Sequence, residues 1–102
     1  MYLIQLLLPV YDNEKNPFGR EAFDLVREEL AHEFGGVTAF MSAPAEGVWR
    51  EGTGGVSRDD VVVFEVMCEQ LERAWWTRYR AQLEERFRQD LIVARSCEIQ
   101  RL

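Results

Sequence analysis

Residues 60–68 read Asp-Val-Val-Val-Phe-Glu-Val-Met-Cys and form the strongest strand pattern in this 102-residue chain. A short apolar run rich in β-branched and aromatic residues is typical of a central strand that is covered on both faces. One carboxylate, Glu65, stands inside the run. A buried carboxylate has to be paired or protonated, so Glu65 is the first candidate for chemistry.

Three further segments have strand patterns. Residues 2–10 form another near-continuous apolar run with a single polar residue, and we expect this strand to be central as well. Residues 91–99 predict the last strand of the chain. Residues 37–41 predict the remaining strand, which we extend past Pro44. Because proline lacks the N–H that a strand donates to its neighbour, this strand should lie at a sheet edge or contain a bulge.

Two segments have helical spacing. We expect the first helix to begin at Pro17, with Asn16 as its N-cap, and to end near Phe34, where two glycines follow. The second is predicted over residues 69–89, with Trp76 near the edge of its apolar stripe. The apolar residues of that stripe are Leu71, Trp75, Trp76, Tyr79, Leu83 and Phe87.

The order strand, helix, strand, strand, helix, strand predicts an α+β, ferredoxin-like βαββαβ fold. Two interleaved right-handed crossovers give an antiparallel sheet of order 4-1-3-2 with both helices on one face. The two most apolar strands then become the central ones, and the strand that contains proline falls on an edge. We expect a single ferredoxin-like domain over residues 1–102.

The face of this sheet that carries no helix is also apolar. Alternation along the two central strands places these residues on it: Leu3, Gln5, Leu7, Val61, Val63, Glu65 and Met67. A patch of this size indicates an interface. We therefore expect a homodimer in which the two open faces meet.

With this element order and strand polarity, the whole chain resembles the dimeric α+β barrel superfamily of ferredoxin-like proteins. That superfamily includes small cofactor-free monooxygenases, muconolactone-isomerase-like enzymes, heme-degrading and heme-dependent members, and uncharacterised domains. The resemblance implies a dimer with a barrel-like interior. It transfers no catalytic residue, because no catalytic signature of these enzymes occurs in the sequence.

In the predicted strand order, Gln5 lies beside Glu65 and Arg95 lies just beyond Gln5. If the register is favourable, the three residues form a polar row across the open face. The row either orients a small organic ligand in an apolar pocket or fixes the dimer register as an interface network. We add Met67 and Trp49 to the candidate pocket residues, and Trp49 either caps the pocket mouth or packs against the partner.

Composition narrows the choice of partners. A formal charge of −6 argues against a nucleic-acid partner, and the short apolar segments argue against a membrane span or signal peptide. We expect a cytoplasmic protein in which Cys68 and Cys97 are unbridged core residues. The one histidine, His32, predicts an exposed ion pair with Glu28 or Glu29, and we expect neither a metal nor a cofactor.

Two classes of function remain open. In the first, the protein is a small enzyme or ligand carrier that uses the apolar space between two open faces, with Glu65, Gln5 and Arg95 as orienting or acid–base groups. In the second, it is a non-catalytic interaction domain whose open face only mediates dimerisation. A pocket beside Glu65 would favour the first class, and a fully packed interface the second.

Overall fold

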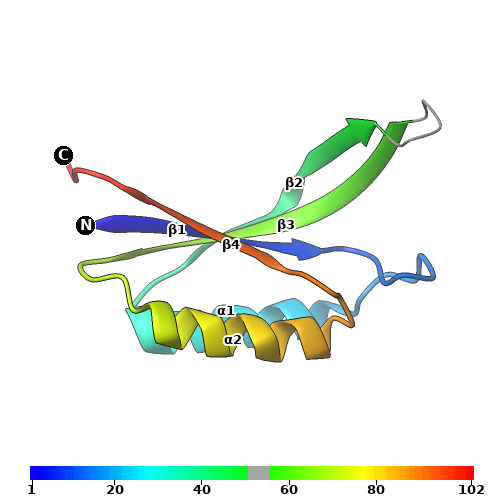
Figure 1. The fold of residues 1–102 in the computed structure, drawn as a ribbon. Helices are drawn as coiled ribbons and strands as arrows, with labels where there is room; N and C mark the ends of the chain where they lie inside the picture. Colours follow the sequence, from blue (N-terminus) through cyan, green and yellow to red (C-terminus); the bar gives the residue numbers. More distant parts are fainter. Residues whose placement is uncertain (51–55) are drawn as a thin grey trace.

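Four antiparallel strands form one sheet, and two helices cover one of its faces (Figure 1). This computed structural model describes the backbone of residues 1–50 and 56–102 and the side chains of residues 1–40 and 61–102. The elements in chain order are β1 (Tyr2–Pro9), α1 (Arg20–Phe34), β2 (Thr38–Arg50), β3 (Val56–Cys68), α2 (Arg73–Arg86) and β4 (Val93–Glu98).

The sheet order is β2-β3-β1-β4, which confirms the predicted ferredoxin-like topology. The central position of β1 between β3 and β4 follows from its composition, because an apolar strand is best placed where both of its faces can be covered. β1 pairs with β3 from Tyr2 to Pro9 and with β4 from Tyr2 to Leu7. These two ladders set the neighbours of every residue in β1.

The core lies between the sheet and the helices. β1 contributes Ile4, Leu6 and Leu8, each no more than 2% exposed. β3 also contributes every second residue, and these side chains are buried as well. The other buried core residues are Phe23, Val26, Leu30, Val62, Phe64, Val66, Trp76, Tyr79, Leu83, Phe87 and Ile92. Because side chains alternate across a strand, this pattern leaves the residues between them on the opposite face.

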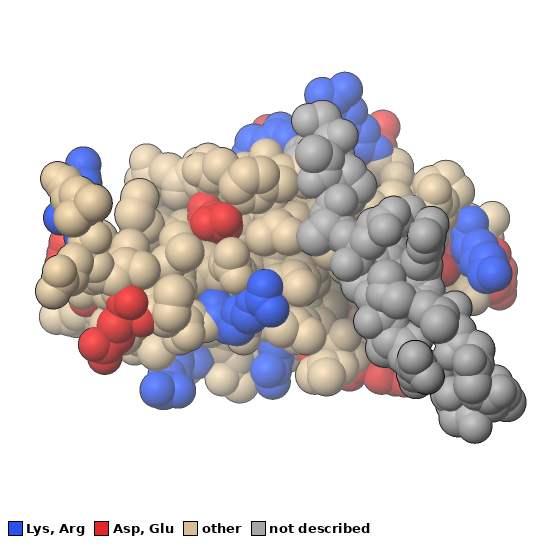
Figure 2. Space-filling model, turned by 90° about the horizontal axis from the view of Figure 1, so that it is seen from above, with Lys and Arg blue, Asp and Glu red and all other residues tan. Residues whose placement is uncertain are grey.

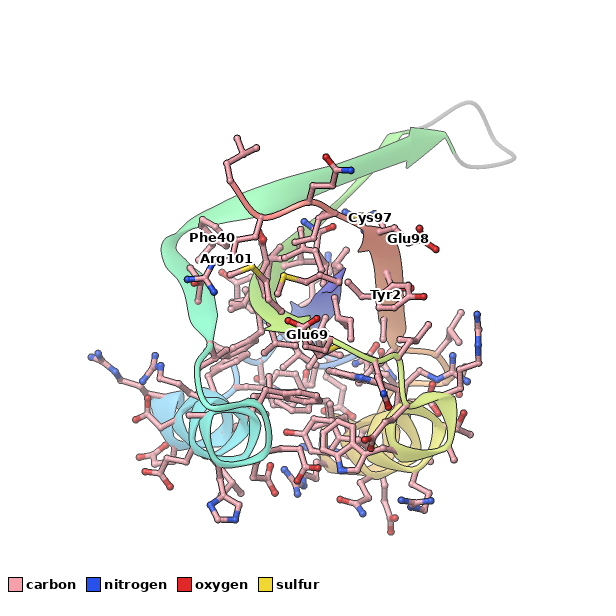
Figure 3. The ribbon with its side chains drawn as sticks, turned by 90° about the vertical axis from the view of Figure 1, so that its left-hand side faces the viewer. Tyr2, Phe40, Glu69, Cys97, Glu98 and Arg101 are labelled. Carbon is pink, nitrogen blue, oxygen red and sulfur yellow. The ribbon has the colours of Figure 1, made fainter. Side chains whose placement is uncertain are left out.

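The predicted consequences of Pro44 both occur at the backbone level. β2 is an edge strand, and its pairing with β3 shifts register between Phe40 and Ala45. Beyond the shift, β2 and β3 continue as a two-stranded ribbon in which residues 45–50 pair with residues 56–61. Figures 1 and 3 show this ribbon rising on the side of the sheet away from the helices.

The start of α1 was predicted three residues too early. α1 begins at Arg20, and Pro17 belongs to the preceding loop. Asp12 organises that loop, because its Oδ1 accepts the backbone N–H groups of Glu14 at 2.8 Å and Asn16 at 2.9 Å. Asn16 is therefore part of a closed turn and does not cap the helix.

The end of α1 was predicted correctly, and the apolar stripe of α2 packs into the core. Gly35 follows α1 with φ of 79°, the left-handed conformation expected of a glycine at a helix C-terminus. Trp76, predicted near the edge of the stripe, is 7% exposed and belongs to the core. Its ring stacks on Phe34 at 5.4 Å between centroids, which holds it between the two helices.

Candidate functional site on the open face

The strand register brings Glu65, Gln5 and Arg95 into one row across the open face. Gln5 lies opposite Glu65 of β3 and opposite Arg95 of β4, and Thr38 of β2 lies opposite Glu65. Directly paired residues in an antiparallel ladder point to the same side of the sheet. A polar row of four residues, Thr38–Glu65–Gln5–Arg95, therefore crosses all four strands, and we call it the polar row.

One bond within the polar row is direct. Arg95 Nε donates to Gln5 Oε1 at 2.8 Å. Gln5 and Glu65 are half-buried, whereas Arg95 lies on the edge strand and is exposed. Gln5 is thus held in one orientation by Arg95, and its amide nitrogen has no partner among the side chains that the structure describes.

Apolar rows flank the polar row on both sides. On one side Leu3 lies between Met67 and Cys97, and on the other side Leu7 lies between Val63 and Val93. The second apolar row ends at Phe40 of β2, which lies opposite Val63 and is 44% exposed. The open face is therefore an apolar surface crossed by one line of hydrogen-bonding groups.

Figure 2 shows the same face from above as a mostly uncharged surface. Few charged side chains interrupt its visible centre, and most of the others lie toward the rim. Met67, a candidate pocket residue, belongs to this surface and is 53% exposed. Met67 and Leu3, which lie opposite each other, make this part of the surface apolar.

For Trp49, the remaining candidate pocket residue, the structure describes the backbone alone. Trp49 belongs to the β2–β3 ribbon, where its backbone pairs with Ser57, and its side chain lies outside the described residues.

Cys97 was predicted to be a core residue and is exposed, because it stands on the open face of the edge strand β4. Cys68 is half-buried on the helix-covered face, where burial raises the pKa of its thiol. Both cysteines are free.

Sequence reasoning missed a polar network between the two helices. Arg86 donates to both carboxylate oxygens of Glu29, at 2.6 and 2.7 Å, and Tyr79 Oη donates to Glu29 at 3.0 Å. The hydrogen bond from Arg86 lowers the pKa of Glu29, and burial raises that of Tyr79. Glu29, one of the two predicted partners of His32, is paired with Arg86 of α2. The seven-residue spacing of Tyr79 and Arg86 was the available signal.

These groups define what the open face can do chemically. Glu65 can accept hydrogen bonds, Arg95 can donate them, and Gln5 can do both. No cluster of three or more potential metal ligands (His, Cys, Asp or Glu) occurs among the residues that the structure describes. Within the same part of the chain, no helix has the length and apolar character needed to cross a membrane.

Comparison with solved structures places the chain in a class of folds. Its α+β arrangement is similar to that of a phage SAM lyase, whose apo structure matches with a TM-score of 0.62 and 15% sequence identity. The same type of enzyme in complex with S-methyl-5′-thioadenosine matches with a TM-score of 0.58 and 16% identity. Both matches cover 95% of this chain and about four fifths of the lyase chain. No protein-family model and no curated protein matches the sequence.

Proposed function

We propose that this protein is a homodimer that binds a small organic molecule on the open face of its sheet. The observation that supports this most strongly is the polar row, because it lies between two apolar rows. Small-molecule sites are mostly apolar and carry a few hydrogen-bonding groups that orient the ligand. Glu65, Gln5 and Arg95 supply those groups, and Leu3 and Leu7 supply apolar contacts on either side.

The second copy of the chain closes the site in this proposal. The exposed Met67, Phe40 and Val93 are apolar groups that a facing sheet would remove from water. This is the arrangement of the dimeric α+β barrel superfamily, which we propose as the wider group of the protein. The β2–β3 ribbon rises on the same side of the sheet, so it extends the surface that a partner meets (Figure 1).

The structural neighbours suggest the class of ligand. One phage SAM lyase structure holds S-methyl-5′-thioadenosine, a molecule with hydroxyl and amino groups and an apolar thioether. We take this nucleoside thioether as the first candidate for the present protein. Glu65 would accept hydrogen bonds from its hydroxyl or amino groups, and the apolar rows would contact its methylthio end.

Isothermal titration with S-methyl-5′-thioadenosine tests this proposal. We expect saturable binding to the unchanged protein and at least tenfold weaker binding to Glu65→Gln, about 1.4 kcal/mol. Glu69→Gln is the matched control, because Glu69 is exposed just beyond β3 and should leave the affinity unchanged. Absence of binding to the unchanged protein would reject this ligand class.

The hydrogen bond between Arg95 and Gln5 also fits the alternative function, an interaction domain without a ligand. In that case the polar row only fixes the dimer register. The oligomeric state of the Glu65→Gln variant, measured by light scattering, distinguishes the two functions. A dimer that persists while ligand binding weakens favours the binding protein, and loss of the dimer with no ligand bound by either protein favours the interaction domain.

A further inference from the structure

A second candidate site lies on the helix-covered side of the molecule, at the edge where α2 passes β4. A cavity of about 170 Å³ occupies this place. On the helix side it is lined by Arg73, Trp76, Thr77 and Arg80, whose spacing of three and four residues puts them on one face of α2. Figure 3 shows β4, with Cys97 labelled, on the same side of the molecule as α2.

Small side chains explain why the cavity exists. Ala94 and Ser96 of β4 lie opposite Leu6 and Ile4 of β1, so they face the helices. Both line the cavity, and neither is large enough to fill the space between the edge strand and α2. Larger residues at these two positions would have extended the core to the edge of the sheet.

The cavity is cationic in a chain of net negative charge. Arg73, Arg80 and Arg95 line it, and no aspartate or glutamate is among the described residues that do so. Arg95 directs its Nε to Gln5, so we count only Arg73 and Arg80 as groups for a ligand. Arg80 also forms a long ion pair with Glu84, with 3.8 Å between Arg80 Nε and Glu84 Oε2, a distance that is too long for a hydrogen bond.

Two buried donors on residues that line the cavity have no hydrogen-bond acceptor within the described part of the protein. They are Trp76 Nε1 and Arg80 Nε. Trp76 is more than nine-tenths buried, and Glu84 Oε2, which forms the long ion pair with Arg80, also accepts the N–H of Ile92 at 2.9 Å. Buried donors are nearly always paired in proteins, so these two indicate a missing acceptor.

We propose that this cavity binds a small organic carboxylate. The carboxylate would accept hydrogen bonds from Arg80 and Trp76 and would be attracted by Arg73, and the apolar body would contact Ile4 and Leu71. The volume suits such a molecule, because an apolar cavity of about 150 Å³ is enough to hold benzene. This site is separate from the proposed function, because its ligand groups lie on the other side of the sheet from Glu65.

Benzoate and benzyl alcohol are a suitable pair of probes, because they share a ring and differ in charge. We expect benzoate to shift the indole N–H resonance of Trp76 saturably in nitrogen–proton NMR spectra, with the resonance assigned from Trp76→Phe. Benzyl alcohol should bind at least tenfold more weakly. Equal binding of the two probes, or no saturable shift with benzoate, would overturn the proposal.

Two arginine variants complete the test. Arg80→Gln should weaken benzoate binding at least tenfold, whereas Arg78→Gln should leave it unchanged, because Arg78 lies on the same helix but faces the groove beside His32. If Arg80→Gln does not fold, Trp76→Phe in isothermal titration takes its place and should also weaken binding. Unchanged affinity in the folded variant would contradict the site.

Discussion

The two faces of the sheet are built from the same strands and differ in what covers them. On β1, Leu6 and Leu8 meet the helices and are at most 1% exposed, whereas Leu3 and Leu7 face away and are half-buried. The helix-covered face packs against α1 and α2 of the same chain. The open face has apolar side chains of the same kind and carries neither of the two helices, which is why we propose that a partner covers it.

We expect the largest effect on stability from a substitution on the helix-covered face. Leu6→Ala should lower the free energy of unfolding by about 2–5 kcal/mol, because it leaves a cavity among fully buried neighbours. Leu7→Ala, at the adjacent residue on the open face, should cost less at low protein concentration and more at high concentration, where we expect the proposed dimer to form. Urea denaturation at two concentrations measures both. If both variants lost the same free energy of unfolding at both concentrations, the two faces would not differ in what covers them.

The next prediction concerns association. Leu7→Asp places a charge within the second apolar row and should weaken the dimer at least 100-fold, about 2.8 kcal/mol. Leu25→Asp is the matched control, because Leu25 is 45% exposed on α1 and far from the open face in the fold. Size-exclusion chromatography with light scattering should give a monomer for the first variant and a dimer for the second. A dimer in both variants would show that the interface does not include Leu7.

A smaller effect is expected from the polar network on the helices. Glu29→Gln should lower stability by about 1 kcal/mol at pH 7, since it breaks a partly exposed bidentate pair with Arg86. The pKa of Glu29 is held below its ordinary value of 4.5, so the stabilisation is complete above that pH and is lost as the pH falls through the lowered pKa. Thermal unfolding should therefore show the two proteins converging below pH 4.5. A constant difference from pH 7 to pH 3 would exclude this cause.

The smallest predicted effect is a difference in labelling rate. Cys97 is exposed on the open face, so a partner there should slow its alkylation, whereas half-buried Cys68 on the other face should react slowly in either state. Mass spectrometry of maleimide adducts, with Leu7→Asp as the monomeric reference, measures the rates. Identical Cys97 rates in the two proteins would place this cysteine outside the interface.

The fold was predictable because hydrophobic pattern and element order agree. The two apolar runs around residues 2–10 and 60–68 had to be central, and Pro44 had to lie at an edge. Local hydrogen bonding was harder to foresee. Asp12 draws the chain into a turn that delays α1, and nothing in the spacing of Asn16 and Pro17 distinguishes that turn from a helix cap.

The candidate sites were predictable to different degrees. Gln5 and Glu65 followed from strand alternation, but the place of Arg95 depended on the register of β4, which pattern alone does not give. The cavity beside Trp76 depends on which face of α2 meets a short edge strand. That packing is a tertiary property, and the apolar stripe by itself pointed only to a core.

Sedimentation equilibrium of the unchanged protein at micromolar concentration tests the central claim most directly, which is that the open face is covered by a second copy. The chain has a mass of 11.9 kDa. We predict a stable dimer of twice this mass that dissociates on dilution. A single species of 11.9 kDa over the whole concentration range would contradict it, because the apolar rows around Glu65 would then remain in water.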